Sequence, residues 1–134
     1  MTPTPLFPEY PSVPVTASGH LAWHLRLAQG LPVSLFRALS EKGLFNRPDL
    51  AEVVFGKRSS PRQGELPLES ANSAYRVLVS LELARAAFAG DTPKAVAWLS
   101  SPQSLLRGRV PLRMLSTSMG FDYVRTAIER LGAR

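Results

Sequence analysis

Two histidines, His20 and His24, come nearest in this sequence to a metal-binding pattern. Four residues apart, they share one face of an expected helix, and that spacing can bind a metal ion. Trp23 lies between them, and two ligands do not complete the four-coordinate shell of zinc. A third ligand is not evident nearby. We therefore interpret the pair as surface or packing residues and expect no metal site.

Patterns that would support catalysis are missing from the sequence. The chain has no cysteine, no glycine-rich phosphate loop after a strand and no Gly-x-Ser-x-Gly element, and its ten acidic residues are scattered. An enzyme needs a nucleophile and base, or a pair of carboxylates, brought together by the fold. We therefore expect a binding protein that is not an enzyme and needs no cofactor.

A basic segment in the first half is the candidate for DNA contact. Asp49 to Phe55, a turn at Gly56 and a second helix beginning at 59–63 would give a helix-turn-helix. Gly64 and then Pro67 leave this second helix only one turn, so a solvated basic loop is the alternative. The side chains expected to reach phosphates or bases are Lys57, Arg58, Ser59, Ser60, Arg62 and Gln63.

Positive charge also gathers in the second half of the chain. The net charge is +6, of which residues 19–65 hold +3 and residues 66–134 hold +4, while residues 1–18 hold −1. A basic chain favours an acidic partner, nucleic acid included. Because the larger share lies outside the basic segment, the charge indicates an arginine-bearing C-terminal surface for a protein partner as much as a DNA reader.

The elements that must position these residues are helices. Apolar residues recur near the helical period, and no stretch alternates as a strand does, so we predict an all-α fold. A chain of 134 residues is long enough to bury a core. We expect a flexible proline-rich tail over 1–18, a helical domain over 19–66, and a long helix followed by a small C-terminal domain over 67–134.

Helix starts and stops can be located from single residues. Asn46, Asp91 or Thr92, and Ser116 or Thr117 are expected N-caps, and a long, centrally buried helix is expected from about Pro67 to Phe88. In the first helix, Leu21, Leu25 and Ala28 repeat as an apolar face. No run of 18 apolar residues and no signal-peptide pattern is present, which predicts a cytoplasmic protein.

The segment 83–134 contains, in order, Phe88, Lys94-Ala95, Trp98-Leu99, Pro102, Leu105, Gly108, Pro111-Leu112, Leu115, Thr117 and Gly120. With these elements at this spacing, the segment resembles the C-terminal toxin-binding domain of the Xre/MbcA/ParS antitoxins. Residues 30–88 are similar to the N-terminal Xre-like half of that family, opening on Gly30-Leu31-Pro32-Val33. Two departures stand out: Gln103 or Ser104 replaces the usual asparagine, and the DNA-reading run is broken by proline.

The resemblance implies a type II antitoxin that inhibits a RES-domain, NAD-consuming toxin by covering its active site. It also implies a homodimer and possible repression of its own operon; the alternative is a helix-turn-helix regulator without a toxin. From chain position and charge we expect the toxin contacts at Arg107, Arg109, Arg113, Phe121, Arg125, Arg130 and Arg134. The terminal carboxylate of Arg134 could stand in for a phosphate oxygen of the dinucleotide. Leu35, Phe36, Phe45 and Phe55 are candidates for either the dimer contact or the core.

Overall fold

The computed structural model describes residues 17–41, 45–56 and 64–132. These residues form seven α-helices and one short 3-10 helix, and they include no β-strand beyond two isolated bridges. The all-α prediction is therefore confirmed for the described part of the chain. The helices are α1 (Ala17–Gln29), α2 (Val33–Glu41), α3 (Arg47–Phe55), α4 (Leu68–Ala87), α5 (Thr92–Leu99), η1 (Ser104–Leu106), α6 (Pro111–Met114) and α7 (Ser118–Gly132).

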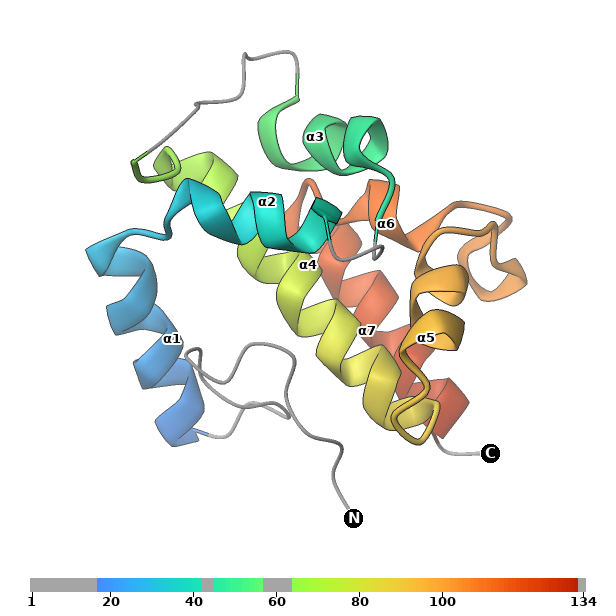
Figure 1. The fold of residues 1–134 in the computed structure, drawn as a ribbon. Helices are drawn as coiled ribbons and strands as arrows, with labels where there is room; N and C mark the ends of the chain where they lie inside the picture. The colour runs from blue at the N-terminus through green and yellow to red at the C-terminus, as the bar shows by residue number, and fades with distance from the viewer. Residues whose placement is uncertain (1–16, 42–44, 57–63, 133–134) are drawn as a thin grey trace.

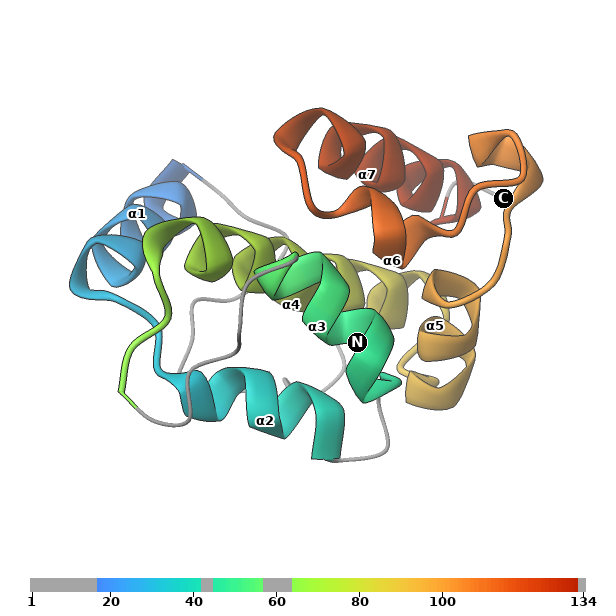
Figure 2. The same cartoon turned by 90° about the horizontal axis from the view of Figure 1, so that it is seen from above.

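Helix α4 is the centre of the molecule, with α7 on one side and α2 on the other (Figure 2). It packs against α1, α3, α5 and α7. Its buried residues run round most of its circumference, as the sequence predicts for residues 77–88. A helix surrounded in this way supports α5 and α7 directly, and α6 and η1 pack in turn against α7 (Figure 1).

The helix caps confirm the local predictions. The side chain of Asn46 accepts a hydrogen bond from Asp49 N, and that of Asp91 accepts one from Lys94 N. Thr117 Oγ1 accepts from Gly120 N at 3.0 Å. Each short polar side chain satisfies an amide that the first turn of its helix leaves unpaired, which is why these starts can be read from single residues.

The buried face of α1 differs from the predicted one. Leu21 and Leu25 are 59% and 52% exposed, whereas Trp23 is 2% exposed and packs edge-on against Tyr75, with ring centroids 4.7 Å apart. Ala28 is also exposed. Burying an indole removes more apolar area from water than burying a leucine, so α1 turns its tryptophan toward α4.

The four residues that were candidates for either a dimer contact or the core belong to the core. They are all between 2% and 5% exposed, and the Phe36 and Phe55 rings meet edge-on at 4.8 Å. A side chain so deeply buried has no area left for a second chain. The four residues are Leu35, Phe36, Phe45 and Phe55. None of the described helices is both long enough and apolar enough to cross a bilayer.

Candidate protein-interaction surface

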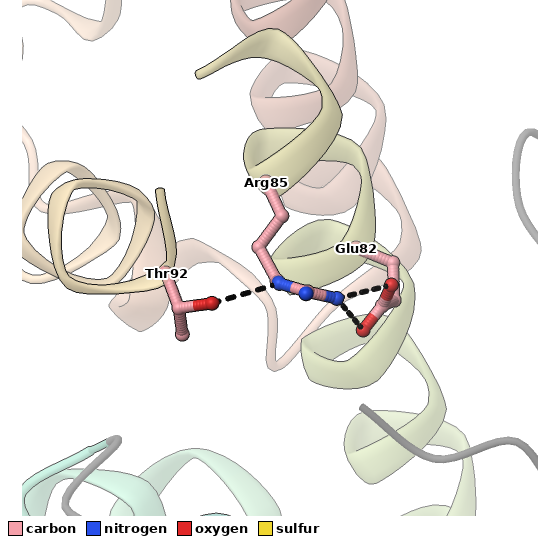
Figure 3. Close-up of polar contacts among 3 residues, drawn as sticks. All are labelled: Glu82, Arg85 and Thr92. Atoms are coloured by element: carbon pink, nitrogen blue, oxygen red, sulfur yellow. Dashed lines mark hydrogen bonds and ion pairs between the residues drawn. The ribbon is translucent and has the colours of Figure 1, made fainter. Parts of the chain in front are cut away.

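A buried polar cluster joins the end of α4 to the start of α5 (Figure 3). Arg85 is 5% exposed, and its Nη1 donates to both carboxylate oxygens of Glu82 at 3.0 and 2.9 Å. Its Nε donates to Thr92 Oγ1 at 2.9 Å. A desolvated guanidinium is stable only when its donors are satisfied, so this cluster favours one arrangement of α4 and α5. The elements η1, α6 and α7 follow α5 in the chain, so the orientation of α5 sets where they begin.

The turn after α5 is built around Gln103. Its side-chain amide donates to the carbonyl of Trp98 at 2.8 Å and to that of Ser101 at 3.2 Å. Its backbone pairs with Arg109 and accepts from Gly108 at 2.8 Å. Gln103 thus closes a loop over 103–109 and ties it to α5. In this loop Gly108 has φ +81°, a conformation that glycine adopts without strain.

The junction between α6 and α7 depends on a close approach of two backbones. A Cβ on Gly120 would overlap the carbonyl oxygen of Met114, because the first turn of α7 lies directly on the end of α6. Arg76 of α4 holds the same junction by donating to the carbonyl oxygens of Leu115 and Ser116 at 3.3 and 3.2 Å. These contacts explain why a cap at Thr117 is followed three residues later by glycine.

The arginines named from the sequence lie in three settings. Arg107 and Arg109 are exposed in the loop over 103–109 and make no ion pair with a described residue, and the same holds for Arg130 on α7. Arg113 lies 3.6 Å from Asp49 of α3. Arg125 lies 3.5 Å from Asp122 and over the Phe121 ring at 5.8 Å. Arg134 is outside the described residues.

Phe121 has a packing role in this structure. Its ring is partly buried, with its centroid 6.2 Å from that of Tyr75 on α4. Burial raises the pKa of Tyr75, although the charges of Arg125 and Arg76 act to lower it. Burial likewise lowers the pKa of Arg76, and the charge of Tyr75 acts to raise it. Because the Phe121 ring of α7 contacts the Tyr75 ring of α4, Phe121 helps to hold α7 on α4.

A groove between η1 and α7 is a feature that the sequence reasoning did not anticipate. It has a volume of about 320 Å³ and is lined by Leu105, Leu106, Asp122, Tyr123, Thr126, Ala127 and Arg130. Tyr123 is 64% exposed and Leu105 40% exposed, and Met119, one turn before Tyr123, is 74% exposed. The available signal was weak: positions 119, 123, 126 and 130 share one face of α7, largely opposite the buried Val124 and Ile128, where apolar residues such as Met119 and Tyr123 are unexpected.

The six residues predicted to contact DNA, Lys57, Arg58, Ser59, Ser60, Arg62 and Gln63, lie outside the described residues. The helix before them is described: α3 ends at Phe55, and Gly56 follows with φ +62°. Besides α4, α3 packs against α2 and α6. Together with the Arg113–Asp49 pair, this contact joins the helix that precedes the basic segment to the C-terminal elements.

The histidine pair can be placed in part. His24 is exposed on α1, and the side chain of His20 is outside the described part. Among the residues that the structure describes, no group of three or more His, Asp or Glu side chains could hold a metal ion.

Comparison with known proteins finds similarity to antitoxins. Residues 83–134 match the family described as the antitoxin Xre/MbcA/ParS C-terminal toxin-binding domain. The chain is also similar to an antitoxin Xre of Pseudomonas putida strain KT2440, with 26% identity over 104 residues. That match covers 75% of this chain and 65% of the relative, so the chain spans slightly less than two thirds of the relative's length. The groove, the loop over 103–109 and α7 all lie within the matched residues.

Proposed function

We propose that this chain, whose residues 83–134 match the Xre/MbcA/ParS toxin-binding domain family, is the antitoxin of a type II toxin–antitoxin system. The observation that carries the proposal is that match, which covers α5, η1, α6 and α7 together with the end of α4. In its mechanism the chain acts as a stoichiometric inhibitor and not as a catalyst. Its C-terminal helices, held on α4, present a preformed surface to the toxin.

The partner in this proposal is a RES-domain toxin that consumes NAD in the cytoplasm. The antitoxin covers the entrance to the toxin's active site. The basic C-terminal surface supports this arrangement through charge: of the described residues 104–132, five arginines and two acidic residues are exposed. Such a surface attracts an acidic region of a partner and raises the rate at which the two proteins meet.

The test is co-expression with the product of the adjacent reading frame, followed by co-purification and an assay of cellular NAD. We expect a stable complex, and NAD that is consumed by the toxin alone but preserved when this chain is present. NAD loss that continues in spite of this chain would contradict the proposal. Removing residues 132–134 tests separately whether these residues enter the toxin's active site, because full inhibition by the truncated chain would exclude a role for Arg134.

Repression of its own operon by a homodimer is a further part of the proposal, and it rests on the basic segment. Phosphate contacts release counterions, so operator binding through this segment has a steep salt dependence. Replacing Arg58 and Arg62 with alanine should abolish an operator gel shift and leave toxin inhibition intact. If inhibition disappears together with the shift, the division into a DNA-reading and a toxin-binding part is wrong.

A further inference from the structure

We infer that the groove between η1 and α7 receives an apolar side chain from an acidic surface of the toxin, with Arg130 pairing with a carboxylate at its rim. This inference rests on the proposed function and specifies how the toxin is recognised. A groove of about 320 Å³ lies at the lower end of the roughly 300–1,000 Å³ typical of small-molecule sites. It suits an inserted side chain such as leucine or phenylalanine better than a whole cofactor.

The groove has an apolar wall on each element. Leu106 of η1 is buried and anchors that element in the core, while its neighbour Leu105 is 40% exposed at the groove. On α7, Ala127 forms the floor next to the core and Tyr123 stands beside it, 64% exposed. An exposed tyrosine next to an apolar hollow is the kind of residue that dominates binding energy at protein interfaces.

Exposed apolar residues occur at the groove and on the adjoining face of α7. Six large apolar side chains are prominently exposed, and three of them, Leu105, Met119 and Tyr123, lie on η1 and on this face of α7. The other three, Leu21, Leu25 and Leu68, lie on α1 and at the start of α4. Apolar area that remains exposed after folding, when it is contiguous and rimmed by polar groups, is typical of an interaction site.

Charge identifies the kind of partner. Arg130 lines the groove and makes no ion pair with a described residue. Arg107 and Arg109, on the adjoining loop, also make no ion pair with a described residue. The rim of the groove is thus cationic in spite of Asp122, and it favours an acidic surface. A second copy of this chain would bring the same positive charge and be repelled. All seven lining residues lie within the part of the chain that matches a toxin-binding domain.

The experiment measures affinity for the purified product of the adjacent reading frame. Tyr123→Ala and Leu105→Ala should each weaken binding at least tenfold, because each removes a wall of the groove. Arg130→Glu should slow association and reduce its dependence on salt. Leu68→Ala and Arg37→Glu are matched controls, because both residues are exposed and both lie outside the residues that match the toxin-binding domain, and they should change affinity less than twofold. Thermal melts should agree across all five variants.

Four outcomes are distinguishable. Losses confined to the three groove variants support the inference. If the unmodified chain binds and neutralises the toxin and the groove variants do the same within twofold, the toxin docks elsewhere and only this inference fails. If the unmodified chain neither binds nor neutralises the toxin, the proposed function itself fails. If the groove variants change sedimentation of the chain alone and leave toxin binding unaltered, a second copy occupies the groove and the inference is overturned.

Discussion

Replacing Gly120 with alanine tests the contact that seats α7 on α6. Gly120 lies in the first turn of α7, where its N–H donates to Thr117 Oγ1 at 3.0 Å. A Cβ at this position would overlap the carbonyl oxygen of Met114 and come within 2.8 Å of the carbonyl carbon. Since both atoms belong to the backbone, no change of rotamer relieves the overlap, and α7 must move away from α6.

The magnitude follows from two opposing effects. Overpacking a close contact costs about 1–3 kcal/mol, and a backbone obstacle places Gly120→Ala at the upper end. Alanine regains about 1 kcal/mol through its higher helix propensity. We therefore expect the free energy of unfolding to fall by about 2 kcal/mol. For a chain of 134 residues this lowers Tm by roughly 6–10 °C.

The assay is urea and thermal unfolding followed by far-ultraviolet circular dichroism, with Gly132→Ala as the control. Gly132 is the last residue of the same helix, and a Cβ there meets no atom within 4 Å. Its free energy of unfolding should change by less than about 0.5 kcal/mol. If Gly120→Ala proves as stable as the unmodified chain, the start of α7 can shift without cost, and the close approach does not determine where α7 lies.

Three further predictions concern the core. Arg85→Met should lower the free energy of unfolding by about 2–3 kcal/mol, because it leaves the mostly buried Glu82 carboxylate without this partner. In urea titrations, adding Glu82→Met should recover at least half of that loss. If nothing is recovered, lost packing and not the uncompensated charge causes the destabilisation. Trp23→Ala should cost about 3–5 kcal/mol but Leu25→Ala less than about 0.5 kcal/mol, and comparable losses would contradict the orientation of α1. Because burial raises the pKa of Tyr75 above its ordinary 10.0, the unfolded chain releases this proton first, so the stability contributed by the neutral phenol is complete below pH 10.0 and is lost as the pH rises further. Tyr75→Phe should therefore lose less stability than the unmodified chain as the pH is raised above 10.0, and parallel losses would refute this account.

The helix boundaries were largely predictable because their signals are local. Asn46, Asp91 and Thr117 each cap the helix that follows, and α4 begins and ends within one residue of the predicted bounds. A cap needs only a short polar side chain and the amides of the next turn. The resemblance carried by residues 83–134 was equally readable, because it depends on residue types and spacing along one continuous segment.

The candidate site was predictable only in part. The arginine-rich stretch was visible, but the sequence does not show that Arg113 lies near Asp49 of α3 or that Phe121 faces Tyr75. Both contacts join residues far apart in the chain, so no local pattern reports them. The apolar members of the surface, Leu105 and Tyr123, were missed because a hydrophobic residue on a helix is expected in the core unless the packing of its neighbours is known.

By itself the sequence determined the helical class, the caps, the central helix and the toxin-binding resemblance, since each depends on residues within a few turns of one another. Only the tertiary structure decided which face of α1 is buried and which apolar residues of η1 and α7 remain exposed. On α1 the indole of Trp23 displaced two leucines from the interior, and on α7 the contacts with α4 left Tyr123 at the surface beside Leu105. Those choices depend on which distant side chains compete for the same buried space, and that competition is resolved only when the helices pack.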